Sequence, residues 1–150
     1  MAHLTISAPW GGALTLWEDG GALTGLTFSA AEGGKETPLL LEARAQLAAY
    51  FSGNLRSFSL PLALRGTAFQ RAVWNALEKI PYGETCSYAA LAEAAGHPGA
   101  CRAAGNANGK NPLPIFIPCH RVIRTGGAIG GYAGGLAAKK FLLELEKRYA

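Results

Sequence analysis

The chain has 150 residues, 49% of them hydrophobic, which suits one compact unit or a small module beside a larger one. No run approaches the roughly 18 apolar residues of a membrane span, the N-terminus lacks signal-peptide features, and three widely spaced cysteines favour free thiols in a reducing cytoplasm. The net charge of +4 is uneven, since residues 1–60 hold three Lys/Arg and five Asp/Glu while residues 61–150 hold eleven and five, so the second part either faces a polyanion or has a solvated basic surface.

The first part of the chain predicts strands followed by one helix. Residues 3–29 are rich in Thr, Leu and aromatic residues between glycines, and residues 18–21, Glu-Asp-Gly-Gly, have the composition of a hairpin turn. Pro38 can begin a helix that Gly53 ends, because apolar residues recur there at helical spacing, namely Leu40, Ala43, Leu47 and Phe51. Residues 55–66 predict a further strand and a link to the second part.

The second part predicts mainly helices. Thr67, with a glutamine three residues later, fits a capping box at the start of a helix that Pro81 ends. Residues 87–96 and 98–107 predict two short helices joined by a tight turn that contains glycine, which is a helix-turn-helix pattern. Residues 134–149 predict a last helix.

The second helix of that pair is composed almost entirely of Ala, Gly and Asn. Small side chains let a helix lie close to another backbone, which can be a neighbouring helix or a DNA groove. Base reading in the major groove normally uses several long polar side chains, and this helix offers mainly Arg102 and Asn106. If it binds DNA, we expect contacts that depend on shape rather than sequence, in the minor groove.

Cys119 and His120 end a proline-rich apolar strip, residues 111–118. Adjacent side chains do not normally face each other, so a bend or a water molecule would have to connect them as nucleophile and base. The alternative is an inert buried cysteine beside an ordinary histidine. Glu146 lies on the apolar face of the last helix and can either orient the histidine or lie in solvent. The chain has no standard zinc spacing, so we predict no metal.

Five segments together resemble the O6-alkylguanine-DNA alkyltransferase (methylated-DNA–protein-cysteine methyltransferase) family of direct-reversal DNA repair proteins. They are PCHRV (118–122), RAAGNANGKNP (102–112), GYAGGL (131–136), FLLELE (141–146) and the stretch 66–92. The resemblance covers residues 66–150 strongly and residues 1–60 loosely. It implies an α+β fold, with a small N-terminal α/β (RNase H-like) module in residues 1–60 and a mainly helical domain with a helix-turn-helix in residues 66–150.

The resemblance implies irreversible, stoichiometric transfer of an alkyl group from O6 of guanine, and also from O4 of thymine, to Cys119 after base flipping. His120 would act as the base, Glu146 would hold the histidine, Asn111 would brace the turn before the motif, and Tyr88 would donate a hydrogen bond to the leaving guanine. The remaining implied residues are Arg102, Ala100, Cys101, Ala103 and Ser87 at the DNA, and Tyr132, Ala133, Pro114 and Val122 around the substrate pocket.

The implied setting is a DNA repair enzyme that acts once, as a monomer in the cytoplasm at the bacterial nucleoid, on double-stranded DNA that contains O6-alkylguanine. It needs no cofactor and no membrane. Two alternatives stay open. A non-catalytic DNA-binding lesion sensor or regulator would use the same helix-turn-helix, and a thiol hydrolase would use the same cysteine but turn over repeatedly.

Overall fold

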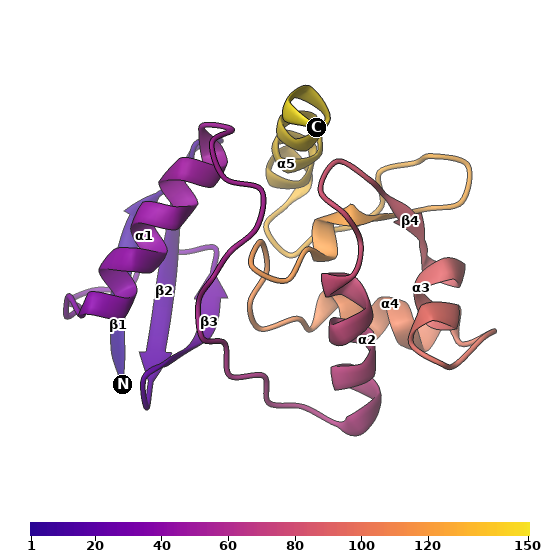
Figure 1. Ribbon diagram of the computed structural model, residues 1–150, viewed down its shortest axis with the longest axis horizontal. Coiled ribbons are helices and arrows are strands. Elements are labelled where there is room, and N and C mark those ends of the chain that lie inside the picture. The colour runs from indigo at the N-terminus through magenta and orange to yellow at the C-terminus, as the bar shows by residue number, and fades with distance from the viewer. The chain divides into compact units, whose positions relative to one another are not determined.

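The computed structural model describes all residues, 1–150, and divides them into two compact units, Met1–Leu64 and Arg65–Ala150. The first unit contains a three-stranded sheet and one helix, and the second is mainly helical (Figure 1). This arrangement confirms the predicted α+β class with strands first and helices after them.

The first unit is an antiparallel sheet in the order β1-β2-β3, built from Ala2–Ser7, Ala13–Asp19 and Ala22–Thr27. The predicted hairpin turn lies between β2 and β3, where Gly20 and Gly21 both have positive φ, as a tight two-residue hairpin requires. Helix α1, Pro38–Phe51, begins at the N-cap Thr37 and packs on the sheet. The strand expected in residues 55–66 is reduced to a single bridge, Leu62 with Leu23.

Helix α1 contributes one side of the core of the first unit. Its buried residues are three or four positions apart, which is the spacing of one helix face. The strands bury leucines against this face, and the set comprises Leu40, Ala43, Leu47 and Tyr50 from the helix with Leu14, Leu16, Leu23 and Leu26 from the sheet.

The second unit begins with α2, Ala68–Glu78, and the predicted capping box at its N-terminus is confirmed. The Thr67 hydroxyl accepts the Gln70 N–H at 3.1 Å, and the Gln70 side chain accepts the Thr67 N–H at 3.0 Å. Helix α2 packs against two short helices, α3 (Tyr88–Ala94) and α4 (Cys101–Gly109). Trp74 fixes α2 to α4 by donating its indole N–H to the Ala107 carbonyl at 2.9 Å.

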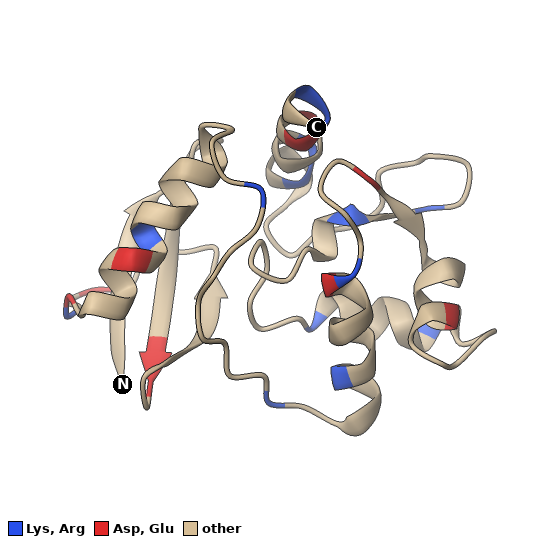
Figure 2. Cartoon of the chain, in the orientation of Figure 1, with Lys and Arg blue, Asp and Glu red and all other residues tan.

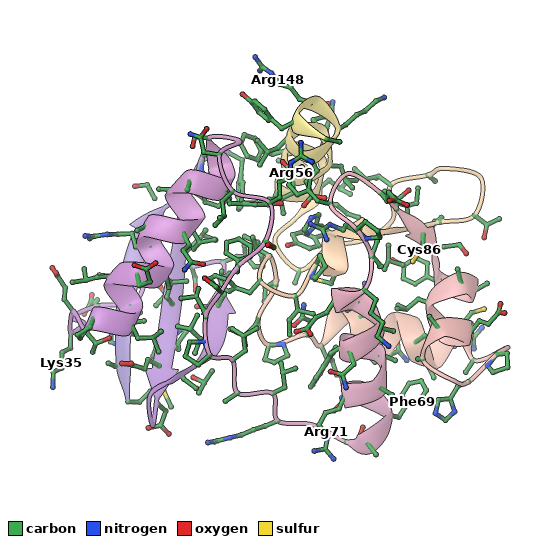
Figure 3. All side chains as sticks on the ribbon, in the orientation of Figure 1. Lys35, Arg56, Phe69, Arg71, Cys86 and Arg148 are labelled. Atoms are coloured by element: carbon green, nitrogen blue, oxygen red, sulfur yellow. The ribbon has the colours of Figure 1, made fainter.

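The turn between α3 and α4 is longer than predicted, because α4 begins later in the chain. Helix α4 begins at Cys101 rather than at Pro98, because Gly99 has a φ of +86°, which a right-handed helix does not allow. Phe69 of α2 meets this turn, with its ring edge-on to His97 at 4.9 Å between centroids (Figure 3). The turn therefore rests on the first residues of α2.

Two short parallel strands join distant segments of the second unit. Strand β4, Cys86–Ser87, precedes α3, and strand β5, Val122–Ile123, follows a 3-10 turn at Cys119–Arg121. Pairs of two residues have no periodic pattern, so the sequence did not predict them. The last helix, α5 (Leu136–Tyr149), packs against the 3-10 turn.

The Thr67→Ala variant tests how much the capping box stabilises the second unit. We expect it to lower the free energy of unfolding by about 1 kcal/mol, because the Gln70 N–H loses its acceptor. Chemical denaturation followed by circular dichroism measures this change. Thr67→Ser keeps the hydroxyl and is the control, and equal stability of Thr67→Ala and Thr67→Ser would contradict the prediction.

Candidate functional site

The proline-rich segment before Cys119 is held by one asparagine and contains a strained residue. The Asn111 side chain accepts the Leu113 N–H at 3.0 Å and donates to the Ile117 carbonyl at 2.9 Å. Ile115, which is 2% exposed, has a φ of +75°, an unfavourable value for a β-branched residue. The surrounding core over-determines this conformation, so the segment presents Cys119 from a rigid support.

Cys119 is buried, with 5% of its surface exposed, and begins the 3-10 turn. Burial raises the pKa of its thiol to about 11, although the side chains of Asn111 and Tyr132 and the charge of Lys139 oppose the rise. The thiol is therefore protonated at neutral pH. It becomes a nucleophile only if a neighbouring base removes its proton.

His120 and Glu146 form a buried hydrogen-bonded pair. The Nε2 atom of His120 lies 2.7 Å from Oε2 of Glu146, and the histidine has no exposed surface. Burial lowers the pKa of His120, although Glu146 raises it, so the ring is neutral at neutral pH. A neutral ring that donates from Nε2 keeps its lone pair on Nδ1, which has no hydrogen-bond partner in the protein. Nδ1 is thus available as a proton acceptor.

Arg121 is a member of this cluster that the sequence reasoning missed. Its Nε and terminal nitrogen donate to the two oxygens of Glu146 at 2.7 and 2.9 Å, and its other terminal nitrogen donates to the Ile80 carbonyl at 2.6 Å. Although burial raises the pKa of Glu146, the hydrogen bonds from His120 and Arg121 lower it to about 2. Arg121 therefore keeps the carboxylate charged and fixes the oxygen that faces His120.

Lys139 is a second missed residue, and it has no exposed surface. Its ammonium group donates to the carbonyls of Val122 at 2.7 Å and Gly131 at 3.1 Å. Burial lowers the pKa of Lys139, whereas interaction with the Cys119 thiolate raises it. One signal was present in the sequence, because Lys139 lies seven residues before Glu146 and so on the same helix face.

A pocket of about 290 Å³ opens over Cys119. It brings together six residues predicted for the site, and the structure adds four that were not predicted. The six are Tyr88, Asn111, Pro114, Cys119, Tyr132 and Ala133, and the four are Gly105, Asn108, Gly109 and Gly131. Val122 was expected here but does not line the pocket, because it is fully buried and pairs with Cys86.

The residues predicted to contact DNA lie around the N-termini of α3 and α4. Ser87 caps α3 by accepting the Ala90 N–H at 3.1 Å. Arg102 and Ala103 are exposed in the first turn of α4, whereas Cys101 and the preceding Ala100 are half-buried. Within residues 65–150, Lys and Arg occur on α2, α4, α5 and several connecting segments (Figure 2).

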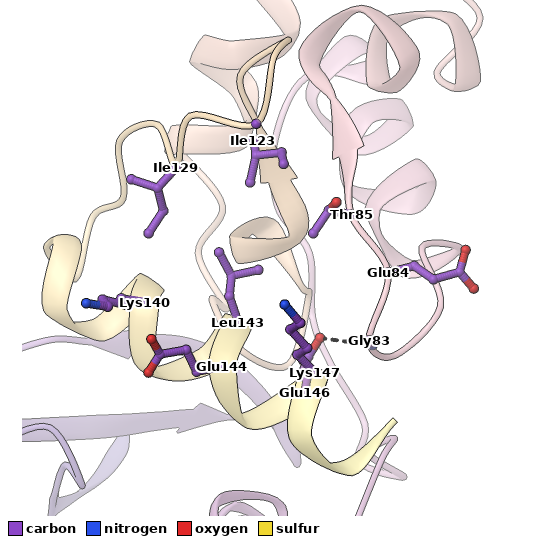
Figure 4. A pocket seen from close by; sticks show the side chains of 11 residues that line it. Gly83, Glu84, Thr85, Ile123, Ile129, Lys140, Leu143, Glu144, Glu146 and Lys147 are labelled. Atoms are coloured by element: carbon purple, nitrogen blue, oxygen red, sulfur yellow. Dashed lines mark hydrogen bonds between the residues drawn. The ribbon is translucent and has the colours of Figure 1, made fainter.

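A second pocket, of about 450 Å³, has Glu146 among the residues that line it (Figure 4). The Gly83 N–H points to Oε1 of Glu146 at 3.4 Å, and the apolar walls come from Ile123, Ile129 and Leu143. The carboxylate is thus hydrogen-bonded by two separate segments of the second unit, residues 120–121 and residue 83. The structure brings no three His, Cys, Asp or Glu side chains together as a metal-binding group. None of its helices combines the length and apolar character of a membrane span.

Two family descriptions match the chain, one for each unit. Residues 1–64 match the 6-O-methylguanine DNA methyltransferase, ribonuclease-like domain, and residues 68–148 match the 6-O-methylguanine DNA methyltransferase, DNA binding domain. The first match agrees with the RNase H-like module that the resemblance implied.

Individual relatives are similar in sequence and in structure. The constitutive methylated-DNA–protein-cysteine methyltransferase of Bacillus subtilis is 57% identical over 114 residues, which are 75% of this chain and 69% of the relative. The methylated-DNA–protein-cysteine methyltransferase of Mycolicibacterium paratuberculosis is 57% identical over 105 residues, 70% of this chain and 64% of the relative. The crystal structure of Mycobacterium tuberculosis OGT in complex with DNA superposes with a TM-score of 0.90 at 47% identity, covering 100% of this chain and 95% of that one.

These matches cover both units, and more than half of the aligned residues are identical in the two curated relatives. The buried cysteine, the neutral histidine and the ionised glutamate lie in the segments that carry the resemblance. The chain belongs to the 6-O-methylguanine DNA methyltransferase family.

Proposed function

We propose that this protein repairs alkylated duplex DNA by moving the alkyl group from O6 of guanine, and also from O4 of thymine, to Cys119. The observation that carries the proposal is the buried Cys119, which lines a pocket of about 290 Å³. The next residue in the chain is His120, which is hydrogen-bonded to Glu146. The names and structures of the relatives support the same reaction and the same DNA partner. Residues 66–150 form the alkyltransferase domain in this proposal, and residues 1–60 are its N-terminal module.

The proposed chemistry begins with loss of the thiol proton. Nδ1 of His120 accepts this proton through a water molecule, because adjacent side chains of the turn do not face each other. Glu146 stabilises the resulting imidazolium. The sulfur then attacks the saturated alkyl carbon, so the S–C bond forms while the C–O6 bond breaks. The electron pair of that bond stays on guanine, which finally receives the proton. Tyr88, on the pocket wall, donates a hydrogen bond to the leaving base.

The product explains why the protein would act only once. A thioether has no carbonyl that water could attack, so Cys119 stays alkylated and each molecule repairs one lesion. The reaction needs no cofactor and no metal, because the thiolate supplies the nucleophile and the hydrogen bonds stabilise the leaving group.

The DNA interface in this proposal is the helix pair α3–α4, acting as a helix-turn-helix against the minor groove. Its small residues Ala100, Cys101 and Ala103 allow close approach to the DNA. Ser87, at the start of α3, faces the sugar-phosphate backbone. Arg102 fills the gap that a flipped base leaves, and a weakened alkylated pair flips at lower cost. We infer a monomer that works at the nucleoid, in the cytoplasm.

Intact-protein mass spectrometry after incubation with a duplex that carries one O6-methylguanine tests the proposal. We expect one methylene unit, about 14 Da, to be added at one equivalent because a thioether forms. Cys119→Ala should gain nothing. Cys86→Ala, which removes another free thiol of the same domain, is the matched control and should gain the same mass.

Two outcomes would replace this function with another one. Tight binding of the damaged duplex without a mass gain would make the protein a lesion sensor. Repeated turnover without a lasting mass gain would make it a thiol hydrolase.

A further inference from the structure

The pocket over Cys119 contains two asparagines whose amides are used differently. The Asn111 amide is committed to the fold, because both its oxygen and its nitrogen make short hydrogen bonds to the backbone of residues 113–117. The Asn108 amide is not. Its nitrogen lies 3.5 Å from the Cys119 carbonyl, at the outer limit of a hydrogen bond, and its oxygen has no partner in the protein.

An amide oxygen without a hydrogen-bond partner is unusual at this depth. Asn108 is only 6% exposed, and the large majority of buried side-chain polar atoms in proteins have a hydrogen-bond partner. It is also one of the residues that line the pocket, on the α4 side. Turning the amide toward a molecule that enters the pocket would break only one long hydrogen bond.

The base that the pocket is proposed to receive has a matching edge. Alkylation at O6 removes the proton from N1 of guanine, so N1 becomes an acceptor beside the 2-amino donor. A carboxamide presents one donor and one acceptor with the same spacing and pairs with such an edge through two hydrogen bonds. O4-alkylthymine presents acceptors at N3 and O2 and can satisfy only the amide nitrogen.

We propose that the Asn108 side chain reads the flipped base, accepting from its 2-amino group and donating to N1, and thereby makes the protein prefer O6-alkylguanine to O4-alkylthymine. This inference rests on the proposed alkyl transfer and adds a specificity-determining residue to it. The bond to N1 also contributes to the reaction. Negative charge collects on the guanine ring as the C–O6 bond breaks, so a donor at N1 stabilises the transition state more than the ground state.

The test compares two duplexes of the same sequence, one with O6-methylguanine and one with O6-methylhypoxanthine, which lacks only the 2-amino group. Single-turnover rates of methyl transfer are measured for the wild type, Asn108→Ala and Asn108→Asp. We expect the wild type to react about 10- to 100-fold faster with the guanine duplex, since its amide acceptor is left unpaired by hypoxanthine. Each ratio comes from one protein preparation, so a partly folded variant does not distort it.

Asn108→Ala should bring the two rates within about threefold of each other, because neither base then finds the acceptor. Asn108→Asp keeps an acceptor and should keep the preference for the 2-amino group, at lower absolute rates. A wild type without this preference, or an Asn108→Ala variant that retains the whole of it, would overturn the inference and assign the reading to another group. A wild type that transfers methyl groups from neither duplex would overturn the proposed function, and the inference with it.

Discussion

Replacing Arg121 with methionine should lower the free energy of unfolding by about 3–5 kcal/mol, because it leaves the buried carboxylate of Glu146 without its two-pronged partner. Methionine keeps much of the volume of the arginine stem, so little of the loss comes from packing. The two hydrogen bonds to Glu146, of 2.7 and 2.9 Å, disappear together with the one to the Ile80 carbonyl, while the contacts of Glu146 with His120 and Gly83 remain. Urea denaturation of wild type and variant at pH 7 measures the change.

A second substitution separates the ion pair from the rest of the core. Glu146→Gln in the Arg121→Met background removes the uncompensated charge and should recover part of the lost stability. Arg148→Met is the matched control, because Arg148 lies on the exposed last turn of α5, and we expect a change within about 0.5 kcal/mol. A fall no larger than that of the control would show that Arg121 does not stabilise Glu146.

The acid dependence of stability gives an independent measure of the same pair. In the folded state the pKa of Glu146 is about 2 against an ordinary 4.5, so its ionisation stabilises the fold above pH 4.5 and this contribution is lost as the pH falls toward 2. Without Arg121 the folded pKa lies closer to 4.5. The variant should therefore lose less additional stability than the wild type when the pH is lowered from 5 to about 2.

Replacing Lys139 with methionine should slow alkyl transfer about 10- to 100-fold at pH 7, because a buried positive charge near the Cys119 sulfur is removed. Burial holds the pKa of this thiol at about 11, and Lys139 is one of the groups that oppose the rise. The variant thiol should therefore lose its proton less readily. We measure the single-turnover rate of methyl transfer from pH 6 to 9. The increase of this rate with pH should be shifted to a higher pH in the variant than in the wild type.

The pH profile distinguishes this electrostatic role from a structural one. Lys139 also ties the carbonyls of Val122 and Gly131 together, so its loss can loosen the loop that carries Tyr132. A loosened loop would slow the reaction by the same factor at every pH, and that result would contradict the electrostatic role. Lys140→Met is the matched control, since it removes a neighbouring but exposed lysine and should leave rate and profile unchanged.

Local patterns in the sequence predicted the elements whose signals are contained within a few residues. The capping box at Thr67, the N-cap at Ser87 and the glycine turn after β2 all involve neighbours that are at most three positions apart. The start of α4 was placed at Pro98 because a proline can begin a helix, and the prediction was wrong because the positive φ of Gly99 outweighs that preference. The short pair β4–β5 was not predicted, because it exists only through contact between segments 36 residues apart.

The sequence alone determined the family, because each of the five segments that carry the resemblance, such as PCHRV with Cys119 and His120, is continuous in the chain and needs no fold to be recognised. Only the tertiary structure decided which charged groups are buried around Cys119 and His120. Arg121 and Lys139 look like ordinary cations in the sequence, yet both are buried, where a charge is stable only if another segment supplies its partner. Arg121 finds Glu146 25 positions away, and Lys139 finds the Val122 carbonyl 17 positions away. Spacing along one helix identifies a face, but long-range packing determines what that face meets.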